Sequence, residues 1–135
     1  MANTITNTTI LDGSVHRVVY LTIASDGTEE TDYIVYDSSS FTGTDSLDST
    51  IEQVWWSSSS ATTAGVPANF KLEFDATTDV LALALPANDA VHLDFRPMGG
   101  LKNTAGSGIT GDITLTTLGL VSGDSLTLVL QVRNH

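Results

Sequence analysis

Residues Phe70 to Asp75 read FKLEFD, and this stretch decides the fold class because apolar and charged side chains alternate strictly along it. A period of two places both phenylalanines and Leu72 on one face of an extended segment and the charged residues on the other. Such alternation is typical of a β-strand that covers a core with one face. The segment therefore predicts a strand with three buried side chains.

The same pattern recurs on both sides of this segment. It is found in residues 14–23, 32–37, 51–56, 79–85, 90–96, 109–117 and 125–133. In 79–85 it predicts that Leu81, Leu83 and Leu85 share one face. No segment keeps an apolar stripe of helical spacing, so we expect at most a short helical turn, best placed at 46–51. Eight or so short strands predict a single-domain antiparallel β-sandwich, with a jelly roll as the first choice.

The connections between these strands carry turn residues. Ser122-Gly123-Asp124 predicts a hairpin that joins the last two strands. Residues 57–68 and 97–108 are rich in Ser, Thr and Gly and predict two long loops. Residues 1–11 are polar, and we expect a flexible N-terminal arm there, followed by the β-sandwich domain at 12–135.

The composition favours a single soluble domain without disulfide bonds. The 135 residues suffice for one domain, 41% of them are hydrophobic, and there is no cysteine. The fold is therefore not expected to depend on disulfides, and assembly in a reducing compartment is expected. The polar N-terminus does not resemble a signal peptide, and the longest apolar run, 80–86, is too short to cross a bilayer. We expect a soluble chain with no membrane partner.

The charge balance argues against nucleic acid as a partner. Five Lys and Arg stand against 16 Asp and Glu, which gives a net charge of −11 at pH 7. Binding to a phosphate backbone requires a basic patch that displaces counterions. The five cations are scattered along the sequence, so neither nucleic acid nor an anionic membrane surface is expected.

No constellation of residues favours an enzyme. Gly123 to Leu126 spells the GDSL motif of a hydrolase family, but here the motif opens the last strand and no Asp-x-x-His follows. His16 and His92 fall at polar positions of their strands, and His135 ends the chain. A catalytic triad needs a histidine that the fold places beside a nucleophile and a carboxylate. We therefore expect no catalytic residues and no cofactor.

One loop contains four carboxylates and is a candidate calcium-binding site. Residues 26–32 read DGTEETD and supply Asp26, Glu29, Glu30 and Asp32. Carboxylate oxygens suit calcium, but the twelve-residue calcium-loop pattern is absent. Asp-Gly is also a common hairpin signal. A structural turn is the favoured interpretation, and a weak calcium site is the alternative.

Candidate interface residues lie in three places. Trp55 and Trp56 are adjacent and must point to opposite faces of a strand, so one is expected in the core and the other outside. An exposed tryptophan anchors a protein contact or stacks on a sugar. The other candidates are the polar positions His92, Asp94 and Arg96 of the strand at 90–96, and Leu101 and Lys102 of the glycine-rich loop.

Three further stretches carry a family resemblance: FKLEFDATTDVLALALP at 70–86, GGLKNTAG at 99–106 and GDITLT at 111–116. Together with the order of segments from residue 12 to 133, they resemble small virion structural proteins of tailed bacteriophages, of the capsid decoration or cement type. The resemblance implies a non-catalytic jelly-roll or sandwich protein, dimeric or trimeric, made in the host bacterial cytoplasm. It would bind the major capsid protein on the outer surface of the head.

The expected function is therefore capsid decoration, with two alternatives left open. One is a receptor- or carbohydrate-binding β-sandwich module that uses an exposed tryptophan. The other is a tail or neck subunit of the virion, which shares most of its physical requirements with a decoration protein.

Overall fold

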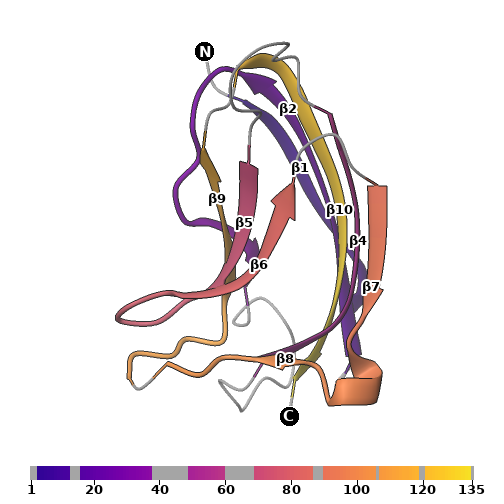
Figure 1. Cartoon of the computed structure of the whole chain (residues 1–135), viewed down its shortest axis with the longest axis vertical. Coiled ribbons are helices and arrows are strands. Elements are labelled where there is room, and N and C mark those ends of the chain that lie inside the picture. The colour runs from indigo at the N-terminus through magenta and orange to yellow at the C-terminus, as the bar shows by residue number, and fades with distance from the viewer. Residues whose placement is uncertain are drawn as a thin grey trace.

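The computed structural model describes residues 3–12, 16–37, 49–59, 69–86, 90–105, 107–118 and 121–134. Within these ranges the chain forms ten strands and one 3-10 helix (Figure 1), which confirms the all-β class. No helix in the described residues is long and apolar enough to span a membrane. The elements are β1 (Thr4–Asp12), β2 (His16–Asp26), β3 (Tyr33–Tyr36), β4 (Ser49–Ser59), β5 (Asn69–Phe74), β6 (Val80–Pro86), β7 (Ala90–Asp94), η2 (Arg96–Met98), β8 (Leu101–Lys102), β9 (Ile113–Leu118) and β10 (Ser122–Asn134).

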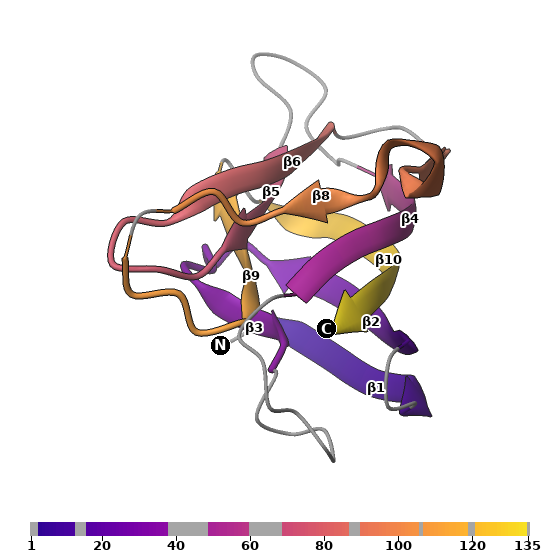
Figure 2. The ribbon, with the colours of Figure 1, turned by 90° about the horizontal axis from the view of Figure 1, so that it is seen from below.

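The strands form two antiparallel sheets that face each other. Sheet A has the order β1-β2-β10-β4-β7, with β8 also paired to β4. Sheet B has the order β3-β9-β5-β6. Figures 1 and 2 show the two sheets as separate layers with their inner faces opposed. The expected antiparallel β-sandwich is confirmed.

The core lies between the two sheets and follows the predicted alternation. Phe70, Leu72 and Phe74 of β5 are all buried, as the opening motif predicts. Burying an apolar side chain of this size stabilises the fold by about 1.5–3 kcal/mol. Sheet A supplies the opposite wall, chiefly from β2 and β10: Val19, Leu21, Ile23, Leu126, Leu128, Leu130 and Val132.

The N-terminal segment is an edge strand, which corrects the expectation of a flexible arm at 1–11. Residues 4–12 form β1 and pair with β2 along its length, for example Thr8 with Tyr20. Asn3 extends this attachment, because its side-chain oxygen accepts a hydrogen bond from the Asp26 amide at 3.0 Å. Threonine is β-branched and suits strands. Among the β1 side chains that the structure describes, Ile5 alone packs on the core, and such a segment has too little apolar weight for its sequence to be distinguished from a loop.

The last two strands do not form the expected hairpin. β9 pairs with β3 and β5 in sheet B, whereas β10 pairs with β2 and β4 in sheet A. Residues 122–124 belong to the irregular start of β10, where the Asp124 carboxylate accepts the Val121 amide at 3.0 Å. When two consecutive strands each bury one face, their sequences alternate in the same way whether the strands pair in one sheet or lie in the two facing sheets. The sequence pattern could not separate the two cases.

Two expectations for the loops also change. The helical turn placed at 46–51 is wrong for Ser49–Ile51, which begin β4, and 46–48 lie outside the described residues. Of the loop expected at 57–68, residues 57–59 continue β4 and the rest also lies outside them. The loop at 97–108 contains most of η2 and all of β8. Glycine is favoured at position 100, since its φ is +87° and a Cβ would collide with Thr50.

A register shift breaks the expected leucine face of β6. Leu72 pairs with Leu83, but Glu73 pairs with Leu81, so Ala82 is an extra residue in the ladder. Such a bulge reverses the facing of the residues beyond it. Leu85 is therefore fully buried while Leu81 is 56% exposed.

Candidate functional site

The outer face of sheet A has an uncharged centre. The strand registers place His92, Trp55, Val129, Tyr20 and Thr8 side by side in one line across β7, β4, β10, β2 and β1, here called the aromatic row. The neighbouring line consists of Ala90, Ser57, Thr127, Thr22 and Thr6. Neither line contains Asp, Glu, Lys or Arg.

Trp55 is the most prominent side chain of the aromatic row. Its ring stacks on the ring of His92 with centroids 4.6 Å apart and an interplanar angle of 2°. An open depression of about 370 Å³ lies here, lined by both rings and by Val129 and Thr127 among others. Trp56 points the other way and is only 6% exposed. The expected division of the two tryptophans is thus present, with Trp56 in the core and Trp55 outside.

A chain of hydrogen bonds runs from His92 along this face. The His92 Nε2 lies 3.0 Å from the Gln53 Oε1, and the Gln53 amide donates to the Gln131 Oε1 at 3.0 Å. The Gln131 amide donates in turn to the Glu52 Oε1 at 3.1 Å. The His16 Nδ1 reaches the same oxygen at 2.8 Å. The stacked histidine is therefore held in place by a chain that ends on a carboxylate.

A bulge in β4 places Glu52 at the end of this chain. Gln131 pairs with Gln53 and Val132 with Ile51, so Glu52 is the extra residue between them. The Phe95 amide donates to its carbonyl at 2.8 Å. Burial opposes ionisation of Glu52, but hydrogen bonds from His16 and Gln131 outweigh it and lower the pKa of the carboxyl group. Glu52 is 6% exposed, and its side chain is charged at neutral pH.

The expected polar group of His92, Asp94 and Arg96 divides into two. His92 belongs to the aromatic row, whereas Asp94 and Arg96 pair with each other at the end of β7. The Arg96 Nε and Nη2 donate to the two Asp94 carboxylate oxygens at 2.9 and 2.8 Å. These hydrogen bonds, with one from the Arg96 amide, lower the pKa of Asp94 to about 2. The pair keeps its charges near neutral pH and below it.

The remaining interface candidates lie on β8 beside a basic line of residues. Lys102 and Arg133 both pair with Thr50, and Arg133 also pairs with His16. We call these four residues the basic row, and Lys102 in it is exposed. Leu101 is half-buried and packs against the core. The cations that are scattered in the sequence are thus partly gathered at one end of sheet A.

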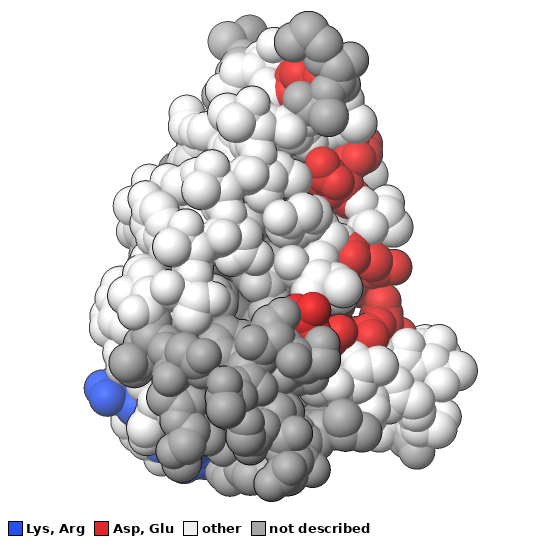
Figure 3. Space-filling model, turned by 180° about the vertical axis from the view of Figure 1, so that it is seen from behind, with Lys and Arg blue, Asp and Glu red and all other residues white. Residues whose placement is uncertain are grey.

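Most of the described acidic residues lie away from the centre of the outer face of sheet A. Of the described carboxylates, Glu52 and Asp94 border the outer face of sheet A at its basic end, and Asp26 borders it at the far end of β2. In the view of Figure 3 the acidic atoms gather on the right, the side on which sheet B lies, and most of the other described atoms on this face are uncharged. The outer face of sheet A is therefore the surface on which an acidic neighbour would meet least repulsion.

The acidic loop of residues 26–32 does not bring its four carboxylates together. Asp26 accepts the Thr28 amide at 3.1 Å, and Glu30 accepts the Asn3 side-chain amide at 3.1 Å. Asp32 instead lies with Glu73 and Asp79, and one oxygen of each is within 4.8 Å of the others. The sequence could not predict this group, because Glu73 and Asp79 reach Asp32 only through the order of strands in sheet B.

Comparisons with protein-family models, with curated proteins and with solved structures each found no match.

Proposed function

We propose that this protein is a non-enzymatic capsid decoration protein, which binds the outside of a tailed-phage head and stabilises the shell by bridging major capsid subunits. The observation that carries the proposal is the uncharged, aromatic outer face of sheet A on a protein of net charge −11. Interfaces are enriched in tryptophan and tyrosine and depleted of charge at their centre. Acidic groups placed elsewhere keep such a protein soluble before assembly.

The order of strands supports a jelly roll as the finer class of the sandwich. With β1 and β8 set aside, the two sheets read β2-β10-β4-β7 and β3-β9-β5-β6. In chain order these are strands 1-8-3-6 and 2-7-4-5 of an eight-stranded fold, which is the arrangement that two Greek keys produce. Jelly rolls of this kind are common in viral capsid proteins and in lectins.

The two rows on the outer face of sheet A are proposed to contact different partners. The aromatic row is the contact with sister subunits in a dimer or trimer, since two copies meet there without opposing their acidic groups. The basic row, at one end of the same face, is the part best suited to an acidic patch on the major capsid protein. The protein is made in the bacterial cytoplasm and resides on the outer surface of the virion head.

Binding to heads that lack the protein tests the proposal. Purified protein is added to such heads, and the amount that sediments with them is measured against concentration. We expect saturable binding that is weaker for Lys102→Glu. Lys71→Glu, in sheet B, is the matched control and is expected to bind normally. No sedimentation of the wild-type protein with heads would contradict the proposal.

One observation favours a second candidate, a receptor- or carbohydrate-binding module. Trp55 lies beside an open depression, and jelly rolls also occur in lectins. A sugar stacking on Trp55 would change the tryptophan fluorescence. Saturable quenching by glycans in the wild type, absent in Trp55→Ala, would support this candidate over the decoration protein.

A further inference from the structure

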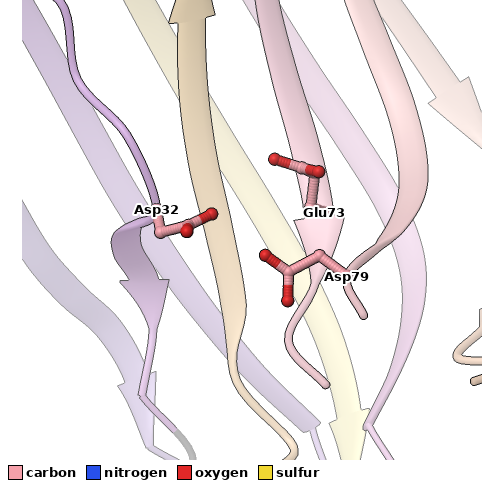
Figure 4. A group of neighbouring side chains, drawn as sticks. All are labelled: Asp32, Glu73 and Asp79. Carbon is pink, nitrogen blue, oxygen red and sulfur yellow. The ribbon is translucent and has the colours of Figure 1, made fainter. Parts of the chain in front are cut away.

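Three carboxylates from separate parts of the chain meet on the outer face of sheet B. Asp32 precedes β3, Glu73 belongs to β5, and Asp79 precedes β6. One oxygen from each lies within 4.8 Å of the other two. Figure 4 shows Asp32 and Asp79 pointing toward each other, with Glu73 beside Asp79.

The group brings three carboxylates close together without a salt-bridged cation among the described residues. No lysine or arginine forms a salt bridge with any of the three carboxylates in the described part of the chain. Burial, followed by the hydrogen bond and charge of Asp79 and the charge of Glu73, raises the pKa of Asp32. The arrangement is therefore unfavourable by itself and would be relieved by a cation.

Asp32 and Asp79 are each held in position by a hydrogen bond. The Asp32 amide donates to the Thr116 Oγ1 at 3.1 Å, which fixes this residue beside β9. The Asp79 Oδ1 accepts the Ala76 amide at 3.1 Å, which leaves its other oxygen for a ligand. The carboxylates thus converge from two anchored turns.

An independent observation points to a ligand at the same place. Thr114 of β9 is 2% exposed, and its hydroxyl is buried without a hydrogen-bond partner. Its neighbours Ile113 and Leu115 are in the core, so its side chain points to the outer face of sheet B, where it pairs directly with Glu73. Directly opposed residues have Cβ atoms about 5 Å apart. A buried hydroxyl normally has a partner, and here the carboxylate group is the adjacent polar site.

We propose that Asp32, Glu73 and Asp79 bind a calcium ion, with the Thr114 hydroxyl as a direct or water-bridged ligand. All the donors are oxygen atoms, which excludes a preference for soft or borderline metals. Calcium accepts six to eight oxygens in irregular geometry and uses carboxylates in one- or two-oxygen modes. Magnesium demands a near-ideal octahedron, to which three converging side chains from separate segments are poorly suited. The ion would tie the turns before β3 and β6 to the centre of sheet B.

Calorimetric titration tests the site. The full-length protein is first dialysed against a chelator and then titrated separately with calcium and with magnesium chloride. We expect one saturable calcium site, weaker magnesium binding, and a higher Tm with calcium. Glu73→Gln and Asp79→Asn should each weaken calcium binding at least tenfold. Asp79→Asn keeps the oxygen that accepts the Ala76 amide, so it preserves the turn.

Two further variants make the outcome decisive. Glu29→Gln removes an acid from the loop that the sequence favours but not from the proposed site, and it should bind calcium like the wild type. Thr114→Val removes the unpartnered hydroxyl, so it should raise the Tm in chelator and lower the calcium affinity. Absence of saturable calcium binding to the wild type would overturn the proposal. Loss of binding in Glu29→Gln with retention in Glu73→Gln would overturn it as well.

Discussion

The ring of Trp55 lies flat on the ring of His92, and the two join β4 to the edge strand β7 on the outer face of sheet A. The hydrogen bond from His92 to Gln53 fixes the imidazole beneath the indole. Trp55 therefore presents a rigid aromatic surface whose conformation is set before any partner binds. Rigid aromatic side chains lose little entropy on binding and often dominate the energy of an interface.

Replacing Trp55 is expected to weaken the self-association that we propose for this protein. Trp55→Ala should weaken self-association by about 2 kcal/mol, or roughly 30-fold in Kd, because it removes the largest side chain of the aromatic row. Light scattering coupled to size-exclusion chromatography measures the mass of each species. Ile34→Ala is the control, since Ile34 is a 45% exposed apolar residue of sheet B. Equal masses for Trp55→Ala and the wild-type protein would contradict a role of Trp55 in self-association.

The hydrogen bond between a buried arginine and a tyrosine is expected to contribute to stability. Arg17 interrupts the apolar face of β2 and is fully buried, and its Nη1 donates to the Tyr36 hydroxyl at 2.8 Å. Removing a partner from a buried charged group costs about 1.5–3 kcal/mol. Tyr36→Phe should lower the free energy of unfolding by that amount in a denaturant titration. Tyr20→Phe, on the outer face, should change it little, and equal effects would refute the importance of this hydrogen bond.

Glu52 is expected to make the fold sensitive to acid. Its folded pKa lies below the ordinary value of 4.5, so the unfolded chain binds a proton more readily than the folded chain. The stabilisation it gives is present above pH 4.5 and is lost as the pH falls through the lower, folded pKa. The free energy of unfolding of Glu52→Gln should therefore fall less steeply than that of the wild type below pH 4.5. Parallel profiles for the two proteins would contradict this origin.

Gly99 and Gly100 offer a matched pair of substitutions. Both have positive φ, +84° and +87°, so alanine at either position is strained by about 1–2 kcal/mol. A Cβ on Gly99 meets nothing within 4 Å, whereas one on Gly100 collides with Thr50 and approaches the Ile51 carbonyl to 3.0 Å. Gly100→Ala should thus be less stable than Gly99→Ala by a further 1–3 kcal/mol or so in thermal and chemical unfolding. An equal loss of stability in the two variants would contradict this prediction, because it would mean that β8 can move away from β4 without loss of free energy.

Deleting residues 1–12 is expected to expose a sheet edge. Loss of β1 leaves the backbone of β2 unpaired on one side, and an open edge of that length promotes aggregation. The truncated protein should unfold at a lower temperature and elute partly as large species. A monodisperse truncated protein with unchanged Tm would show that β1 acts as a detachable arm, as the polar sequence suggests.

Much of the fold is predictable from single strands, because burial on one side imposes a period of two. The core faces of β5 and β10 and the outward position of one tryptophan follow from that period alone. Pairing between strands does not. The placement of β9 and β10 in different sheets, the bulges at Glu52 and Ala82, and the pairing of β1 all depend on which strands are neighbours, and alternation contains no information on neighbours.

The same limit applies to the candidate sites. The sequence places His92 at a polar, outward position and requires one of the two tryptophans to face outward, but it does not say which one. The stacking of Trp55 on His92 requires β4 to lie beside β7. The basic row requires β8 and β10 to flank β4. The acidic loop identifies Asp32 as a candidate in the sequence. Its neighbours in the structure, Glu73 and Asp79, come from β5 and from the turn before β6, so the sequence does not predict the group.

Immunogold labelling of intact virions, with antibody raised against the purified protein, tests the central claim most directly. A decoration protein on the outer surface of the head predicts gold spread evenly over the head. Gold confined to the tail, its tip or the neck would contradict that account and would favour a receptor-binding or tail subunit instead.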